Sequence, residues 1–140
     1  MNSSDIAKWF AAVAGASLVL VGLLGFISNP IVGDPPAIFH TGALHNIVHL
    51  ATGVLALYIA FGLTGVNRAN ALIGYGVLYA AVLVVTLVSP NLFGLFEHPV
   101  NMADHVLHIL LAVGSIAIGW WARSEPVSYT HLTLPTTERV

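Results

Sequence analysis

The chain alternates four long apolar stretches with short segments rich in proline, glycine, asparagine and serine. The apolar stretches lack the regular apolar and polar alternation of membrane β-barrel strands, so helices are expected. A helix of about 22 residues rises roughly 33 Å, enough to cross a hydrocarbon core of about 30 Å. The pattern predicts four such helices, spanning about residues 6–27, 42–63, 69–88 and 102–121.

The polar segments contain signals for helix ends. Ser28-Asn29-Pro30 and Ser89-Pro90-Asn91 are expected to end the first and third helices, because proline lacks an amide donor and disfavours helix in the residue before it. Thr41 and Asn101 are the expected N-caps of the second and fourth helices. The alternative that the first stretch is a cleaved secretory signal is not favoured, because its apolar run is longer than that of a signal.

The second and fourth helices open with related polar stretches, Leu44–Leu50 and Ala103–Ile109. When His49 is placed on His108, each half of the chain contains a helix, a stop of Ser, Asn and Pro, a loop, and a helix with polar groups in its first two turns. Two helices per half give both halves the same direction across a bilayer, as in parallel transporter repeats. The pattern indicates an internal duplication. Convergence is the alternative, since helix ends attract these residue types anyway.

Composition makes lipid the expected surroundings of the chain. It is 57% hydrophobic and 7% charged, whereas soluble domains carry about 25% charged residues. In lipid, helices satisfy all of their own backbone hydrogen bonds. We therefore expect an all-α fold, a polytopic membrane four-helix bundle made of two helical-hairpin repeats in parallel orientation, occupying residues 1–126. A second copy or another membrane protein stays open as a partner.

Charge and cysteine content exclude several other classes. The net charge of −2 with four basic residues gives no support for a nucleic-acid partner. The chain has no cysteine, so disulfides and thiolate metal sites are excluded.

The few charged residues predict an orientation in the membrane. Lys8, Arg68 and Arg123 all fall at one end of a four-span topology, and Asp34 and Glu97 fall in the two loops at the other end. Basic residues are enriched on the cytoplasmic side of membrane proteins. Both termini are therefore expected to be cytoplasmic, in a bacterial inner (plasma) membrane, and the histidines of the two loops and their following helices outward.

The last residues depart from this pattern. The segment Val127–Thr136 has neither membrane-spanning composition nor helical periodicity. It resembles the in-frame translation of a sequencing adapter, so residues 127–140 are expected to be a non-native tail. A native disordered tail is the alternative.

A group of polar side chains carries the candidate chemistry. His45 and His49 are four residues apart, and His105 and His108 are three apart with Asp104 beside them, so each set lies on one helix face. Ionisable side chains inside a membrane normally face the bundle interior. The two sets are expected to converge near the outward mouth of the bundle.

Several interpretations of this group remain open. Imidazoles bind transition metals such as zinc, copper, iron or nickel, and the candidate ligands are His45, His49, Asp104, His105 and His108. A b-type haem would use His49 and His108 as its two axial ligands, with Gly53 and Ala112 leaving room for the ring. A proton relay is a third interpretation, because imidazoles exchange protons near neutral pH.

The remaining interpretation is structural. In it, Asn46, His49, Asp104 and His108 form a hydrogen-bond network that aligns the helices, with Asn101 as a helix cap, and bind nothing. No phosphate-binding loop, dinucleotide fingerprint or hydrolase nucleophile motif is present in the sequence, so no catalytic residue is assigned and an enzyme would have to use the histidines. The sequence favours a structural or accessory membrane protein, with a metal- or haem-binding protein as the alternative.

Three motifs together resemble a known family. They are Leu23-Leu24-Gly25-Phe26, the stretch Leu44–Leu50 followed by Gly53, and Asn101, Asp104, Leu107 and His108 followed by Gly114. The chain from about Trp9 to Trp121 resembles the bacterial family filed as domain of unknown function 4383, small four-span membrane proteins.

The resemblance implies a topology and no chemistry, because the family carries no established activity. The positions that match the family pattern are His45, Asn46, His49, Asn101, Asp104 and His108. His105 is an addition to that pattern, so the resemblance argues against a metal site that requires His105.

Overall fold

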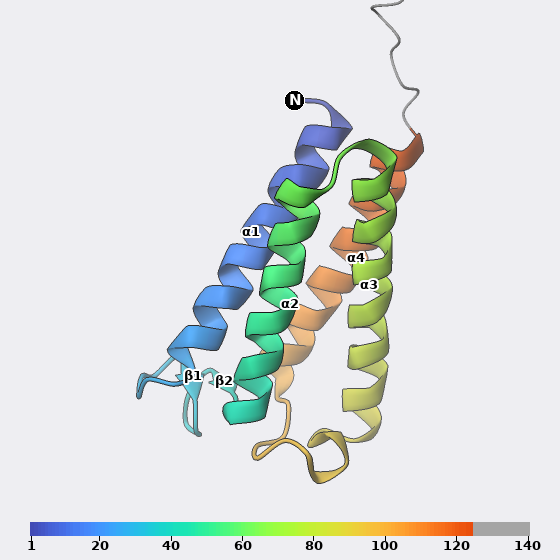
Figure 1. Ribbon diagram of the computed structural model, residues 1–140. Coiled ribbons are helices and arrows are strands. Elements are labelled where there is room, and N and C mark those ends of the chain that lie inside the picture. Colours follow the sequence, from blue (N-terminus) through green and yellow to red (C-terminus); the bar gives the residue numbers. More distant parts are fainter. Residues whose placement is uncertain (125–140) are drawn as a thin grey trace, which may run out of the picture.

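Four long helices are present in the part of the chain that the structure describes, as expected. The computed structural model describes residues 1–124; the segment expected to be non-native, 127–140, lies outside them. The elements are α1 (Ser3–Leu24), β1 (Val32–Gly33), β2 (Phe39–His40), α2 (Ala43–Gly62), α3 (Gly65–Val88), a 3₁₀ turn (Leu92–Gly94) and α4 (Met102–Ser124). The N-terminus, the α2–α3 turn and the end of α4 lie at one end of the bundle, and both long loops lie at the other (Figure 1). We call the latter the loop end.

The first helix is shifted towards the N-terminus relative to the expected 6–27. It begins at Ser3 because the side-chain oxygen of Asn2 accepts a hydrogen bond of 2.8 Å from the backbone N–H of Asp5. It ends at Leu24, ahead of the Ser28-Asn29-Pro30 stop. The side-chain amide of Asn29 donates to the Leu24 carbonyl at 2.8 Å, which fixes a non-helical course after Gly25.

Two further boundary predictions need correction. Thr41 is not the cap of α2: Gly42 occupies that position without a side-chain cap hydrogen bond. The α2–α3 turn is shorter than expected, because Thr64 adopts an extended conformation as N-cap and the helix starts at Gly65. Residues 65–68 contain no proline to stop the helix, so they join it.

Glycines bring the helices of each hairpin into backbone contact. A Cβ atom at Gly15 of α1 would lie 2.8 Å from the Gly53 carbonyl oxygen of α2. A Cβ atom at Gly76 of α3 would lie 2.8 Å from the Ala112 carbonyl oxygen of α4. Small residues permit such close approach in membrane helices. When His49 is placed on His108, Gly53 falls on Ala112, so the second helices of the two hairpins make these contacts at corresponding positions.

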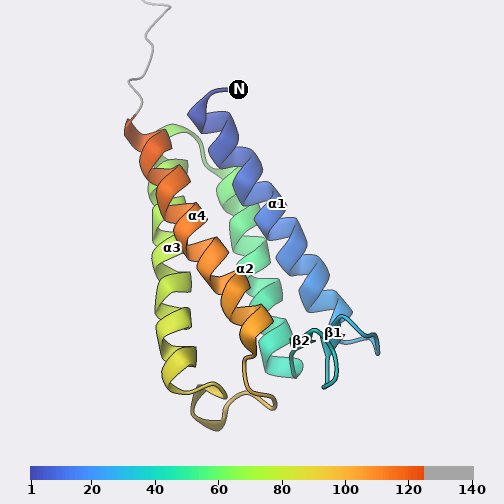
Figure 2. The same cartoon turned by 180° about the vertical axis from the view of Figure 1, so that it is seen from behind.

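The two hairpins pack side by side. Seen from behind, α4 lies between α3 and α1 (Figure 2). The buried core between the hairpins contains residues from all four helices, among them Leu18, Ile59, Leu72, Tyr75 and Leu111.

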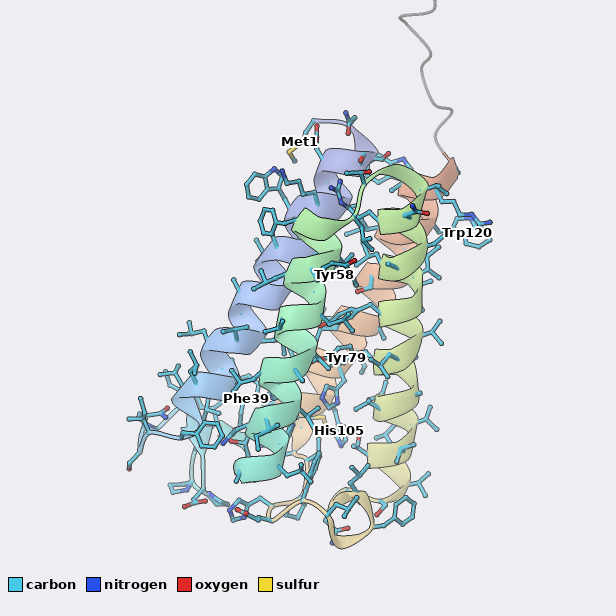
Figure 3. All side chains as sticks on the ribbon, viewed as in Figure 1. Met1, Phe39, Tyr58, Tyr79, His105 and Trp120 are labelled. Atoms are coloured by element: carbon cyan, nitrogen blue, oxygen red, sulfur yellow. The ribbon has the colours of Figure 1, made fainter. Side chains whose placement is uncertain are left out.

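The outward faces of the helices are apolar. Two side chains on each helix, all more than half exposed, illustrate this: Val13, Leu20, Val54, Phe61, Val77, Val84, Leu110 and Val113. Each of the four helices is long and apolar enough to cross a membrane. Trp120 points away from the bundle at the end where Met1 lies (Figure 3), a position typical of an interfacial anchor. The fold is that of a polytopic membrane four-helix bundle.

The glycine contacts predict an effect of Gly76→Ala. The added methyl group would lie 2.7 Å from Ile116 Cγ1 and 2.8 Å from the Ala112 carbonyl oxygen, so α3 and α4 must separate. We expect a loss of about 1–3 kcal/mol of stability, measured as a lower melting temperature in detergent. The matched control is Gly74→Ala on the same helix, where the methyl group meets nothing within 4 Å. Equal melting temperatures for the two variants would contradict the close contact.

Candidate functional site

Three histidines from α2 and α4 meet at the loop end of the bundle. The ring nitrogens that His45, His49 and His108 offer all lie within 4.8 Å of one another. The side chains are 2%, 1% and 2% exposed, respectively. The expected meeting of the two imidazole-bearing helices is therefore observed. We call these three residues the histidine cluster.

The loop between α3 and α4, residues 89–101, covers the cluster. The ring of Phe96 stacks on that of His45, with centroids 4.6 Å apart and planes 5° from parallel. His98 of the same loop contacts Asp34 of the first loop, with 2.8 Å between His98 Nε2 and Asp34 Oδ1. The two loops are thereby joined over the mouth of the bundle.

The cluster contains polar atoms that the rest of the site leaves without partners. Both ring nitrogens of His49, and Nδ1 of His45 and of His108, are buried and have no hydrogen-bond partner within residues 1–124. A buried polar group without a partner costs about 1–3 kcal/mol. Four of the buried side-chain atoms without a partner therefore lie together in the histidine cluster.

The expected hydrogen-bond network does not form. Asp104 exchanges hydrogen bonds with Asn101 instead: Asp104 N–H donates to Asn101 Oδ1 at 3.2 Å, and Asn101 N–H donates to Asp104 Oδ2 at 3.3 Å. This reciprocal pair caps α4, as expected for Asn101. Asn46 is also directed elsewhere, since its side chain lies against the backbone of Gly25, where an added Cβ atom would collide with the Asn46 amide.

Two candidate ligands lie outside the cluster. Asp104 is fully buried, but its carboxylate is not among the groups that converge within 4.8 Å. His105 is partly exposed, and its ring centroid is 6.5 Å from that of His108. The structure therefore brings together three of the five candidate metal ligands.

The site does not fit a haem. Gly53 and Ala112 leave no room for a ring, because each is in backbone contact with the neighbouring helix of its hairpin. The cavity next to His49 and His108 has a volume of about 110 Å³, whereas pockets for large organic ligands measure about 300–1,000 Å³.

Sequence reasoning missed the polar groups beside the cluster. The hydroxyls of Thr52 and Tyr79 are hydrogen-bonded at 2.8 Å, and the Tyr75 hydroxyl donates to the Thr52 carbonyl at 3.2 Å. The ring centroid of Tyr79 is 5.7 Å from that of His108. Hydroxyl groups within apolar helices were the available signal, since buried ones need partners.

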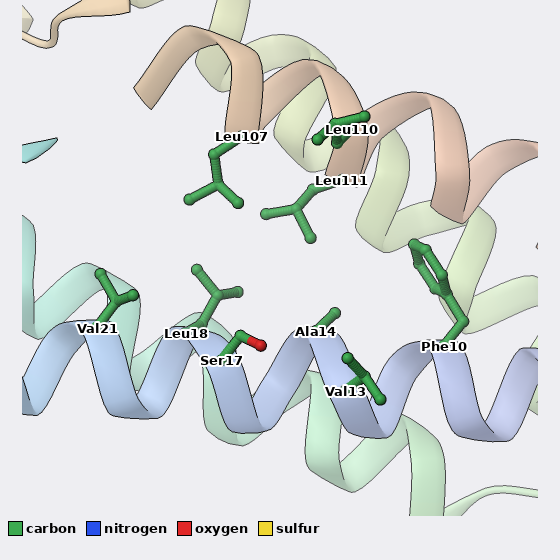
Figure 4. Close-up of a pocket in the computed structure, with 9 residues that line it drawn as sticks. All are labelled: Phe10, Val13, Ala14, Ser17, Leu18, Val21, Leu107, Leu110 and Leu111. Atoms are coloured by element: carbon green, nitrogen blue, oxygen red, sulfur yellow. The ribbon is translucent and has the colours of Figure 1, made fainter. Parts of the chain in front are cut away.

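A second cavity, between α1 and α4, has a different character. Its volume is about 200 Å³, and it is lined by leucine, valine, alanine and phenylalanine with the single hydroxyl of Ser17 (Figure 4). With no titratable group in its lining, it is not a candidate for chemistry.

Fold and site together define a four-helix membrane protein with a buried histidine cluster at one end. The chain belongs to the family described as Domain of unknown function (DUF4383), whose model matches residues 8–121. The comparisons with curated proteins and with solved structures gave no match.

The capping pair predicts an effect of Asn101→Ala. The substitution removes the acceptor for Asp104 N–H and the donor to the Ile38 carbonyl, which is 2.8 Å away. We expect a loss of about 1–2 kcal/mol of stability, measured by thermal unfolding in detergent. Asn67→Ala, at an exposed position in the first turn of α3, is the control and should be nearly neutral. An unchanged melting temperature for Asn101→Ala would contradict the cap.

Proposed function

We propose that this protein binds a divalent transition-metal ion through His45, His49 and His108. The supporting observation is the convergence of three buried ring nitrogens within 4.8 Å. Tetrahedral coordination with metal–nitrogen bonds of about 2.0–2.1 Å places ligand nitrogens roughly 3.4 Å apart, so each ring has to move by less than about 1 Å. Side-chain rotation accommodates such a shift.

The donor set favours certain metals. Imidazole suits zinc, copper, nickel and iron, whereas calcium and magnesium prefer oxygen ligands. The cluster contains no carboxylate, and the chain contains no cysteine. Zinc and copper are therefore the first ions to test.

The metal interpretation accounts for more than the structural one. A structural network would satisfy the buried nitrogens with neighbouring side chains, yet both nitrogens of His49 have no partner within residues 1–124. Coordination supplies a partner for one nitrogen of each ring. A structural or accessory role without a ligand remains the competing function, and it predicts a folded, metal-free protein.

Metal analysis distinguishes the metal-binding function from the structural role. The protein is purified in detergent through a tag without histidine, and its metal content is measured by mass spectrometry after zinc or copper loading. We expect one equivalent per chain in the wild type. Loss of an outer-shell partner already costs about 10–100-fold in metal affinity, so His49→Ala and His108→Ala should weaken binding by more than that.

The matched control is His105→Ala, one turn from His108 and outside the cluster, which should retain the metal. Helical content by circular dichroism verifies that each variant is folded. A folded wild type without metal, or equal metal in all variants, would contradict the proposal and leave the structural role.

We also infer that the loop end faces outward from a bacterial plasma membrane. The supporting observation is charge: Lys8, Arg68 and Arg123 belong to the end with the N-terminus and the α2–α3 turn (Figure 1), and basic residues favour the cytoplasmic side. The cluster would then be reached from outside the cell.

Cysteine labelling tests this orientation. The chain has no cysteine, so Ser28→Cys and Asn67→Cys, both at exposed positions, each carry a single thiol. In intact spheroplasts a membrane-impermeant maleimide should label Ser28→Cys and should reach Asn67→Cys only after lysis. If Asn67→Cys alone were labelled before lysis, the loop end would face the cytoplasm, which would contradict the inferred orientation.

We infer, finally, that the two hairpins derive from an internal duplication. It is supported by the matching contacts of Gly15 with Gly53 and of Gly76 with Ala112. The candidate site then lies where the second helices of the two repeats meet.

A further inference from the structure

We propose that a metal ion in the histidine cluster keeps one coordination position open to the adjacent cavity, where it takes water or a small anion of two or three atoms. This inference rests on the proposed function, because it concerns the ligand of the same metal.

The cavity borders directly on the cluster. All three histidines line it, together with Val48, Thr52, Leu78, Tyr79, Val82 and Phe96. Three protein ligands leave the fourth position of a tetrahedral ion unfilled, which is the arrangement of metal sites that bind a water or a substrate. The other polar side chains in its lining are Thr52 and Tyr79, whose hydroxyls are hydrogen-bonded to each other at 2.8 Å. The lining contains no carboxylate and no further imidazole to serve as a fourth ligand.

The size of the cavity limits the ligand. Its volume is about 110 Å³, and a water molecule takes up about 30 Å³ of liquid. One to three water molecules or a small anion therefore fit, whereas an organic substrate of ordinary size does not.

Hydrogen bonding also favours water in this cavity. A histidine that binds a metal through one nitrogen keeps an N–H on the other, which needs an acceptor. Neither nitrogen of His49 has a partner within residues 1–124. Water in the cavity would accept a hydrogen bond from this N–H group.

Tyr79 is placed to receive a hydrogen bond from such a water. The Thr52 hydroxyl donates to the Val48 carbonyl at 2.8 Å, so in the 2.8 Å contact between the Thr52 and Tyr79 hydroxyls Tyr79 is the donor. The phenol oxygen of Tyr79 keeps its capacity as an acceptor. Metal-bound water is a strong donor, and Tyr79 would position it.

The other half of the chain shows that packing does not require these hydroxyls. When the hairpins are aligned on His49 with His108 and on Gly15 with Gly76, Thr52 falls on Leu111 and Tyr79 falls on Leu18. Both leucines line the apolar cavity between α1 and α4 (Figure 4). Corresponding positions therefore carry leucine beside one cavity and hydroxyl-bearing side chains beside the cavity next to the candidate site.

Cobalt(II) and azide test the proposal. Co²⁺ is added as the only metal to metal-free protein in detergent, and its visible absorption bands are followed during titration with azide. We expect azide to change the bands of wild-type protein, and benzoate, which is too large for the cavity, to leave them unchanged. Val82→Trp should fill the cavity, retain the cobalt bands and raise the azide concentration at half-saturation by at least about tenfold.

The control is Val84→Trp on the same helix, at a position 60% exposed on the outer face, which should respond to azide like the wild type. Cobalt bands that do not respond to azide, or an unaltered azide response in Val82→Trp, would overturn the open position while leaving the metal site intact. Absence of cobalt bands in folded wild-type protein would instead refute the proposed function itself.

Discussion

The backbone contacts within the two hairpins fix the register of the helices on which the histidine cluster depends. Gly15 against Gly53, and Gly76 against Ala112, let α1 approach α2 and α3 approach α4 until a methyl group no longer fits. One residue along a helix corresponds to a rise of 1.5 Å and a rotation of about 100°. A slip of a single residue at these contacts would turn His49 or His108 away from the cluster, so packing in the middle of the bundle sets the geometry of the site at its end.

Besides the hydroxyl contacts of Thr52, Tyr75 and Tyr79 in the middle of the bundle, polar contacts join the hairpins at both ends. At the loop end, His98 contacts Asp34, and Asn101 donates to the Ile38 carbonyl. At the opposite end, the Arg68 guanidinium of α3 donates to the Ser4 carbonyl of α1 at 3.3 Å and to the Ile59 carbonyl of α2 at 3.4 Å. A basic group near the last carbonyls of α2 also interacts favourably with its dipole. The Arg68 bond to the Ile59 carbonyl is buried, where water does not compete for the same groups. The two contacts at the loop end are exposed, so each contributes less.

Apolar length and local spacing were readable from the sequence, and tertiary rotation was not. The four helices and the shared face of His45 and His49 follow from periods along one helix. The environment of Gly53 depends on how α2 is rotated against α1, which no pattern within α2 specifies. The departure of Asp104 from the expected network has a local origin instead, because its capping bonds with Asn101 compete with contacts across the bundle. Thr52 and Tyr79 were missed because they are far apart in the chain and meet only in the fold.

The differences between the hairpins bear on function more than their likeness does. On the proposed duplication, His49 and His108 occupy equivalent positions, whereas the third member of the cluster, His45, has Asp104 as its counterpart, which is bonded to its own helix cap. The cluster therefore takes two ligands from α2 and one from α4. Its cavity lies on the α3 side and has Tyr79 in its lining, whereas the cavity on the α1 side has Leu18 at the equivalent position. A repeat that served packing alone would have no reason to place histidine and hydroxyl groups together on one side, where each costs desolvation, so this asymmetry favours a bound ligand over a purely structural cluster.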